Sequence, residues 1–254
     1  MGKIPQKVVM PRLLWLAVFG IAMGLLEAIV VVYLRELYFP GGFRFPLQII
    51  PERMLGMEIL REICTLIMLV AAASLCTSTF VLRFSLFLFT FGIWDIFYYT
   101  FLKVLINWPE SLFTWDVLFL IPVTWVGPVL APLICSLTMI GLGLLGSFLL
   151  DRRGIVRFGT MPWLLLGGGA IIIFLTFTWD YASVMIQSGF EGITDGGSGP
   201  SYQAVVSSHV PAPYPWGFFL FGESLILAAG TILYRKASGT ANGTVPEDKR
   251  GNYS

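Results

Sequence analysis

Charged residues are scarce in this chain of 254 residues, of which Asp, Glu, Lys and Arg make up only 12%. Hydrophobic residues make up 56%, and the mean hydropathy is +0.80. A soluble domain of this length needs a larger polar surface, so the composition predicts a membrane protein in contact with the lipid bilayer. One histidine (His209) and three cysteines in apolar runs give no basis for a haem, a histidine-based zinc site or a disulfide framework.

Common catalytic signatures are also missing. The patterns G-x-S-x-G, H-E-x-x-H and C-x-x-C do not occur, which leaves out the usual hydrolase, zinc-protease and dithiol motifs. The stretch GLGLLG at 141–146 matches a dinucleotide-binding pattern, but it falls inside an apolar run with no preceding strand. We therefore expect no nucleotide cofactor and no nucleic-acid partner, and whether the protein is an enzyme stays open.

What the chain does contain is a series of long apolar runs. Each comes close to or exceeds the roughly 20 residues that cross a bilayer as a helix. They predict an all-α bundle of about six membrane spans near residues 13–34, 55–76, 84–106, 117–150, 162–182 and 216–234. The first run is too long for a signal peptide and lacks a cleavage site, so it is predicted to be retained. Residues 1–236 would form one membrane domain, followed by a disordered polar tail over 237–254.

The fourth run is too long for one helix and contains Pro122, Pro128 and Pro132. We interpret it as a proline-broken span whose first part, LFLIPVTWVGP, is a half-helix or re-entrant segment packed against protein, since irregular backbone does not face lipid. Two unusually short spans are the alternative.

The basic residues predict the orientation of the bundle. With the N-terminus in the cytoplasm, 11 of the Lys and Arg residues fall on the cytoplasmic side and 5 on the opposite side or its helix ends. Because cytoplasmic loops carry an excess of Lys and Arg, both termini are predicted to be cytoplasmic. Segments 35–54, 107–116 and 183–215 then face outward.

Acidic residues gather in the outer half of the predicted bundle. Four different spans place a carboxylate roughly 10–16 Å below the outer boundary, at a rise of 1.5 Å per residue: Glu27, Glu62, Asp95 and Glu223. A charge at membrane depth costs at least about 2.5 kcal/mol, so these groups must be paired, protonated, hydrated or bound to a ligand. The pattern therefore predicts a polar pocket.

Local spacing adds further candidates. Glu58 and Arg61 share a helical face with Glu62, and Tyr98, Tyr99 and Lys103 follow Asp95 on the third span. Gly20, Gly24 and Ala28 make a small-residue ridge that permits close helix contact. The candidate ligand-binding residues are Glu27, Glu58, Arg61, Glu62, Asp95, Tyr98, Tyr99, Lys103 and Glu223.

Several functions fit these residues. The first is the binding or transport of a small solute or cation. The second is an intramembrane enzyme for a lipid or lipid-linked substrate, in which Glu58, Glu62 and Asp95 hold Mg²⁺ or Mn²⁺ and Arg61 and Lys103 receive an anionic head group. The third is an accessory subunit of a membrane complex, and a homo-oligomer is a further expectation. In a purely structural interpretation, Arg61 pairs with Glu27 or Asp95 and locks the helices together.

The stretch GIWDIFYYTFLKVLINWPESLFTWDVLFLIPVTWVGPVLAP, with LLEAIVVVYLRELY upstream, resembles an uncharacterised family of bacterial polytopic inner-membrane proteins. The resemblance covers about the first 135 residues. It implies a multi-pass protein of the bacterial inner (plasma) membrane and implies no activity, substrate or cofactor.

Overall fold

The computed structural model describes residues 9–153, 159–187 and 207–239. These residues contain six helices that are long and apolar enough to cross a membrane, which confirms the predicted helical bundle. Their bounds are α1 (Val9–Tyr38), α2 (Glu52–Cys76), α3 (Phe80–Ile106), α4 (Leu130–Arg153), α5 (Thr160–Gln187) and α7 (Trp216–Gly239). The chain is a multi-pass membrane protein.

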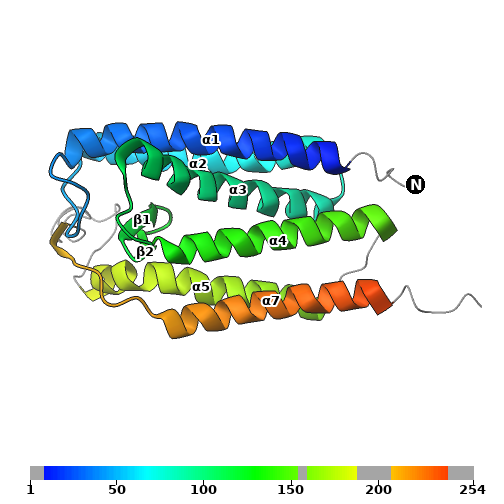
Figure 1. Ribbon diagram of the computed structural model, residues 1–254. Helices are drawn as coiled ribbons and strands as arrows, with labels where there is room; N and C mark the ends of the chain where they lie inside the picture. The colour runs from blue at the N-terminus through cyan, green and yellow to red at the C-terminus, as the bar shows by residue number, and fades with distance from the viewer. Residues whose placement is uncertain (1–8, 154–158, 188–206, 240–254) are drawn as a thin grey trace, which may run out of the picture.

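The helices lie side by side along one long axis (Figure 1). Helix α3 packs extensively against both α1 and α4, whereas α5 and α7 form a pair with smaller contacts to α4 and to the loop before it. The predicted small-residue ridge is part of the α1–α3 contact, since a Cβ at Gly24 would lie 2.8 Å from the carbonyl oxygen of Trp94. Gly24 thus lets the two backbones approach closely.

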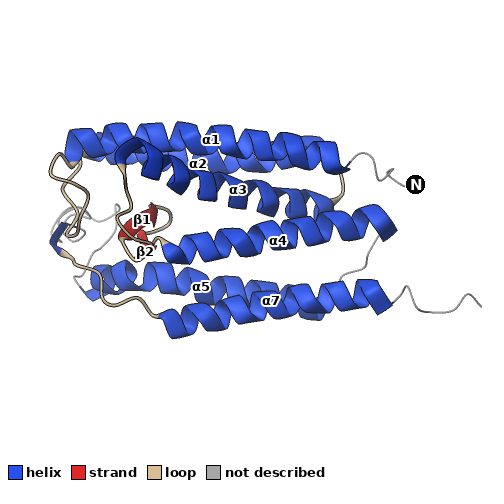
Figure 2. Ribbon diagram, in the orientation of Figure 1, coloured by secondary structure: helices blue, strands red, loops and turns tan. Residues whose placement is uncertain are grey.

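A short antiparallel hairpin separates α3 from α4 (Figure 2). Strand β1 (Trp115–Phe119) pairs with β2 (Trp125–Pro128), and Asp116 lies opposite Gly127. Residues 118–128 (LFLIPVTWVGP), expected as a half-helix or a re-entrant segment, therefore contain strands and form no half-helix. Aromatic and β-branched residues favour strands here, and Pro122 lies in the connection between them, where no ladder N–H is needed.

Helix α4 starts at Leu130, and Pro132 occupies its first turn, where a missing N–H costs no helical hydrogen bond. We call the end of the bundle that carries this hairpin the hairpin end. At the other end α1 begins and α4 and α7 terminate (Figure 1).

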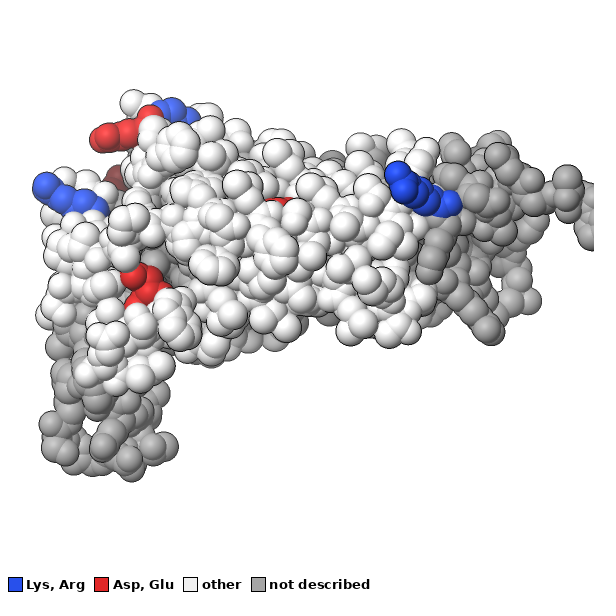
Figure 3. All heavy atoms as spheres, turned by 90° about the horizontal axis from the view of Figure 1, so that it is seen from below, with Lys and Arg blue, Asp and Glu red and all other residues white. Residues whose placement is uncertain are grey.

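The outward faces of the helices are apolar. Large hydrophobic side chains are exposed on these faces, among them Trp15, Leu75 and Phe218. On the face drawn in Figure 3, charged atoms gather near the two ends, and the broad middle is uncharged apart from a small acidic area. This surface suits a hydrocarbon environment. Of the predicted outer loop and tail, residues 188–206 and 240–254 lie outside the described residues, and α7 extends to Gly239.

Candidate functional site

A cavity of about 480 Å³ lies inside the bundle and is bounded by all six helices and the hairpin. The four carboxylates predicted at membrane depth all line it: Glu27 on α1, Glu62 on α2, Asp95 on α3 and Glu223 on α7. Each of these residues is at most 9% exposed. The wall is nevertheless mostly aliphatic and aromatic, so the polar groups form a cluster in an apolar cavity rather than a generally polar pocket.

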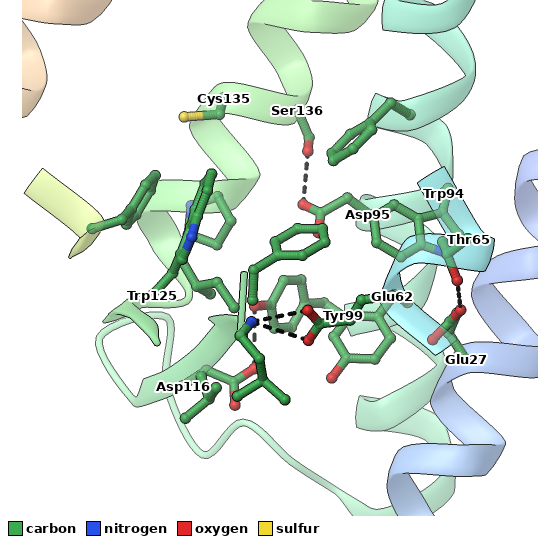
Figure 4. A pocket seen from close by; sticks show the side chains of 18 of the residues that line it. Glu27, Glu62, Thr65, Trp94, Asp95, Tyr99, Asp116, Trp125, Cys135 and Ser136 are labelled. Carbon is green, nitrogen blue, oxygen red and sulfur yellow. Dashed lines mark hydrogen bonds between the residues drawn. The ribbon is translucent and has the colours of Figure 1, made fainter. Parts of the chain in front are cut away.

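Arg61 on α2 forms ion pairs with two carboxylates. It forms an ion pair with Glu27 on α1, and its Nε lies 2.9 Å from Oε2 of Glu58. The hydroxyl of Thr65 donates a hydrogen bond to the other oxygen of Glu27 (Figure 4). The ion pair between Arg61 and Glu27 that a purely structural interpretation predicts is therefore present, and it joins α1 to α2.

Glu62 joins α2 to the hairpin. The backbone N–H of Leu120 donates to both of its carboxylate oxygens, over 2.9 and 3.2 Å (Figure 4). Leu120 directly follows β1, so this contact satisfies a partly buried backbone N–H that has no partner in the two-stranded ladder. Glu62 forms no ion pair within the described residues.

Two more carboxylates are held by hydroxyl groups of α4. Ser136 donates a hydrogen bond of 2.7 Å to Oδ2 of Asp95, and Thr138 donates one of 2.9 Å to Oε2 of Glu223. In Figure 4 Ser136 and Asp95 point toward one another from their two helices. The second oxygen of Glu223, Oε1, is buried and has no hydrogen-bond partner among the described residues. A buried acceptor of this kind calls for a ligand or a water.

A further polar cluster lines the cavity at the hairpin and consists of Arg35, Tyr99 and Asp116. Arg35 at the end of α1 forms an ion pair of 3.1 Å with Asp116 on β1, and Tyr99 donates to the other oxygen of Asp116 over 3.2 Å. The guanidinium of Arg35 also lies 3.6 Å from the ring centroid of Trp108, which is a cation–π contact. Burial raises the pKa of Asp116 above its ordinary value, although the Arg35 guanidinium and two hydrogen bonds act in the opposite direction.

Asp116 and Arg35 were missed by the sequence reasoning. Asp116 ends the first of two FTWD stretches in the sequence, at 113–116 and 177–180, and it is only 2% exposed. The second copy of the stretch ends in Asp180, which lies 2.7 Å from Nε2 of His209. The repeated FTWD stretch is therefore the sequence feature that could have identified Asp116, because the aspartate of each copy makes a polar contact.

The other predicted residues divide into two groups. Tyr98 and Tyr99 line the cavity as expected. Lys103 does not, because it is exposed and its Nζ donates to the carbonyl oxygens of Asn107 and Pro109.

The expected metal ligands are not brought together either. Glu58, Glu62 and Asp95 have separate partners, and no three His, Cys, Asp or Glu side chains among the described residues form a group that could hold a metal ion. The structure thus offers no oxygen-ligand cluster for Mg²⁺ or Mn²⁺ in the part of the chain that it describes.

A row of aromatic rings crosses the cavity from α3 over the hairpin to α5. Phe119 on β1 lies 6.3 Å from Trp94 and 5.5 Å from Trp125 between ring centroids, and Trp125 lies 5.0 Å from Phe174. All four rings line the cavity. They give the cavity an aromatic wall.

No protein-family model matches the chain, and no curated protein or solved structure is significantly similar to it. The resemblance to bacterial membrane proteins therefore stays a prediction. The function of the cavity has to be inferred from its own residues.

Proposed function

We propose that the protein binds an organic cation with an apolar body in this cavity. The observation that carries the proposal is the charge balance of the wall. Two arginines, Arg35 and Arg61, face six carboxylates: Glu27, Glu58, Glu62, Asp95, Asp116 and Glu223. Both arginines are already paired, so Glu62, Asp95 and Glu223 are left without a cationic partner within the described residues.

Buried carboxylates without counter-charges favour a cation over an anion. An anionic head group would have to displace Glu27 and Glu58 from Arg61, or share Arg35 with Asp116 through Nη1, which has no hydrogen-bond partner among the described residues. In either place it would lie among carboxylates that have no ion-pair partner. This argues against the phosphate-binding role considered for Arg61. A cationic centre would instead balance the charge of Glu223, and a protonated amine would in addition donate a hydrogen bond to its Oε1.

The apolar wall favours an organic cation over a small inorganic one. A hydrated or hard metal ion needs several oxygen ligands around one point, and the carboxylates here are separated by apolar side chains. Aromatic rings attract an alkylammonium or phosphonium group through their π-faces, by about 0.5–2 kcal/mol for each favourable contact. The Trp94 and Trp125 side of the cavity offers such faces.

The distribution of Lys and Arg supports a cytoplasmic location for both termini, so that the hairpin end faces outward. In this orientation the cation would enter from the extracytoplasmic side of the membrane. We propose the bacterial inner membrane as the location, on the resemblance given above.

The test uses the full chain in lipid nanodiscs and two ions of the same shape and opposite charge. Equilibrium binding of tetraphenylphosphonium and tetraphenylborate is measured, with empty nanodiscs subtracted. Saturable binding of the phosphonium and none of the borate is the expected result. Equal binding of both ions, or of neither, would remove the cation proposal.

Single substitutions test whether the ion binds inside the cavity. Glu223→Gln and Asp95→Asn each remove one carboxylate charge that has no ion-pair partner. Each should weaken phosphonium binding roughly tenfold or more, since two unit charges about 8 Å apart attract by about 2 kcal/mol at an effective dielectric constant of about 20. Glu36→Gln is the matched control, because Glu36 is exposed at the end of α1 and does not line the cavity. It should leave the affinity unchanged.

A transport role is the second candidate, and the packing of the helices favours it. Helices α5 and α7 pack extensively on each other, and their contacts with α4 and β2 are much smaller. Such a pair could shift against the rest of the bundle around the cavity, as one part of a transporter moves against another. Uptake of tetraphenylphosphonium into proteoliposomes that depends on Glu223 would support transport, and binding without uptake would limit the role to binding.

A further inference from the structure

The apolar part of the cavity continues past the carboxylates toward the other end of the bundle. A second cavity of about 40 Å³ lies there between α3, α4, α5 and α7. The two cavities share four wall residues, all of them apolar: Phe84, Leu88, Leu142 and Leu166. They therefore adjoin, and we call the combined space beyond Asp95 the apolar channel.

We propose that the apolar channel holds a single long hydrocarbon chain, so that the ligand of the cavity is a long-chain amphiphile. This inference rests on the proposed function for the position of the head group, which lies at the carboxylates. The chain would then extend along α3 toward Val81.

The length of the channel agrees with a lipid chain. The α3 residues Asp95, Leu88, Phe84 and Val81 all line it, and the 14-residue interval from first to last corresponds to roughly 21 Å along a helix. Half of a bilayer's hydrocarbon core is about 15 Å thick. A chain as long as that of a membrane lipid would thus fit, whereas a short alkyl group would leave the far part empty.

The width of the channel excludes a bulky body. Its far part has a small volume, and the ring of Trp163 on α5 lies against Phe84, with 5.8 Å between ring centroids. Leu149 and Pro162 line the same end. One flexible chain can follow such a narrow space, and a fused ring system cannot.

The surrounding membrane is itself a source of hydrocarbon chains for the apolar channel. An apolar cavity of this kind does not hold water, and an empty one forfeits the dispersion contacts of its wall. Helices α2 and α5 both line the large cavity, yet in the described part of the chain they are not extensively packed against each other. The gap between these two helices is therefore where an amphiphile would enter the cavity from the membrane in this proposal.

The experiment uses the full chain in phosphatidylcholine nanodiscs and a photoreactive probe, hexadecyltrimethylammonium with a diazirine at the end of its chain. After illumination, the labelled residues are located by peptide mass spectrometry. We expect labels on α3 near Phe84, on α4 near Leu145 and on α5 near Trp163. Labels confined to lipid-facing side chains such as Leu75 and Leu164 would overturn the inference.

A pair of variants on α5 provides the control. Leu166→Trp fills the channel and should lower channel labelling severalfold, whereas Leu164→Trp, at a position that is 65% exposed, should not. Leu142→Phe narrows the channel from α4 and replaces Leu166→Trp if that variant does not fold. Labelling that neither channel variant lowers would overturn the inference.

Two further probes separate this inference from the proposed function. An uncharged hexadecanol probe that labels the channel as strongly as the ammonium probe would support the channel and remove the cation. The opposite outcome is that a butyltrimethylammonium probe binds as tightly as the hexadecyl probe, with Leu166→Trp changing the affinity of neither. That result would support the cation site and overturn the proposal of a bound hydrocarbon chain.

Discussion

Arg35 and Asp116 form a buried ion pair of 3.1 Å that ties the end of α1 to the first strand of the hairpin. The two residues are separated by 81 positions in the chain, so the pair fixes where the hairpin lies in the bundle. Trp108 covers the guanidinium from one side at 3.6 Å. An ammonium group cannot reproduce this planar stacking.

Replacement of Arg35 should therefore destabilise the protein even when the positive charge is kept. Arg35→Lys loses the stacking on Trp108, and Asp116→Asn leaves the guanidinium without its counter-charge. We expect a loss of about 3–5 kcal/mol in the free energy of unfolding for Asp116→Asn, the usual cost of breaking a buried pair, and a smaller loss for Arg35→Lys. Both are measured by denaturant titration in detergent. Arg44→Lys, at an exposed position, is the control and should cost nothing measurable.

Removal of the Glu62 carboxylate should loosen the hairpin more than the helices. Glu62→Leu leaves the partly buried N–H of Leu120 without an acceptor, which costs about 1 kcal/mol, the lower end of the cost of an unsatisfied buried donor. Hydrogen exchange measured by mass spectrometry should accelerate over residues 115–128, and exchange in α1 should stay slow. Glu62→Gln keeps one carbonyl acceptor and should show a smaller effect. A uniform acceleration over the whole chain would contradict this role for Glu62.

The close contact of α1 with α3 makes Gly24 intolerant of a side chain. A Cβ there would lie 2.8 Å from the carbonyl oxygen of Trp94 and 2.9 Å from the backbone nitrogen of Tyr98. These atoms belong to the backbone of α3, so Gly24→Ala must push the helices apart and lower the melting temperature in detergent. Gly167→Ala is the matched control, because a Cβ at Gly167 meets open space and alanine is the better helix former. Equal effects of the two substitutions would exclude this packing role.

The spans and the acidic positions could be predicted from the sequence because both depend on the cost of placing groups in hydrocarbon. A run of apolar residues has few alternatives to a membrane helix, and Glu27, Glu62, Asp95 and Glu223 stood out because a carboxylate at that depth is expensive. Their approach to one cavity also follows, since each group needs a less apolar surrounding than lipid.

The partners of these carboxylates depend on helix rotation, which the sequence does not encode locally. Ser136 and Thr138 lie in an apolar run of α4, where hydroxyl residues are common and usually bond to their own helix. The hairpin was missed because the search for spans treats apolar residues alike, although Val117, Thr124 and Val126 favour strands. Lys103 lies outside the cavity because its Nζ donates to loop carbonyl oxygens, and the spacing of residues along α3 carries no information about that loop.

The Arg61 cluster offers a test of whether its charges act as a unit. Arg61→Met should cost about 3 kcal/mol in the free energy of unfolding, the lower end for a broken buried pair, because Glu27 is then left buried and Glu58 half-buried without a counter-charge. Glu27→Gln removes one of the stranded charges, so the double variant should lose clearly less than the sum of the two single variants. Residues in direct contact typically show a coupling of about 0.5–3 kcal/mol, which unfolding titrations of the four proteins in the cycle can resolve. Strictly additive losses would mean that Arg61 stabilises the bundle through its packing and not through Glu27.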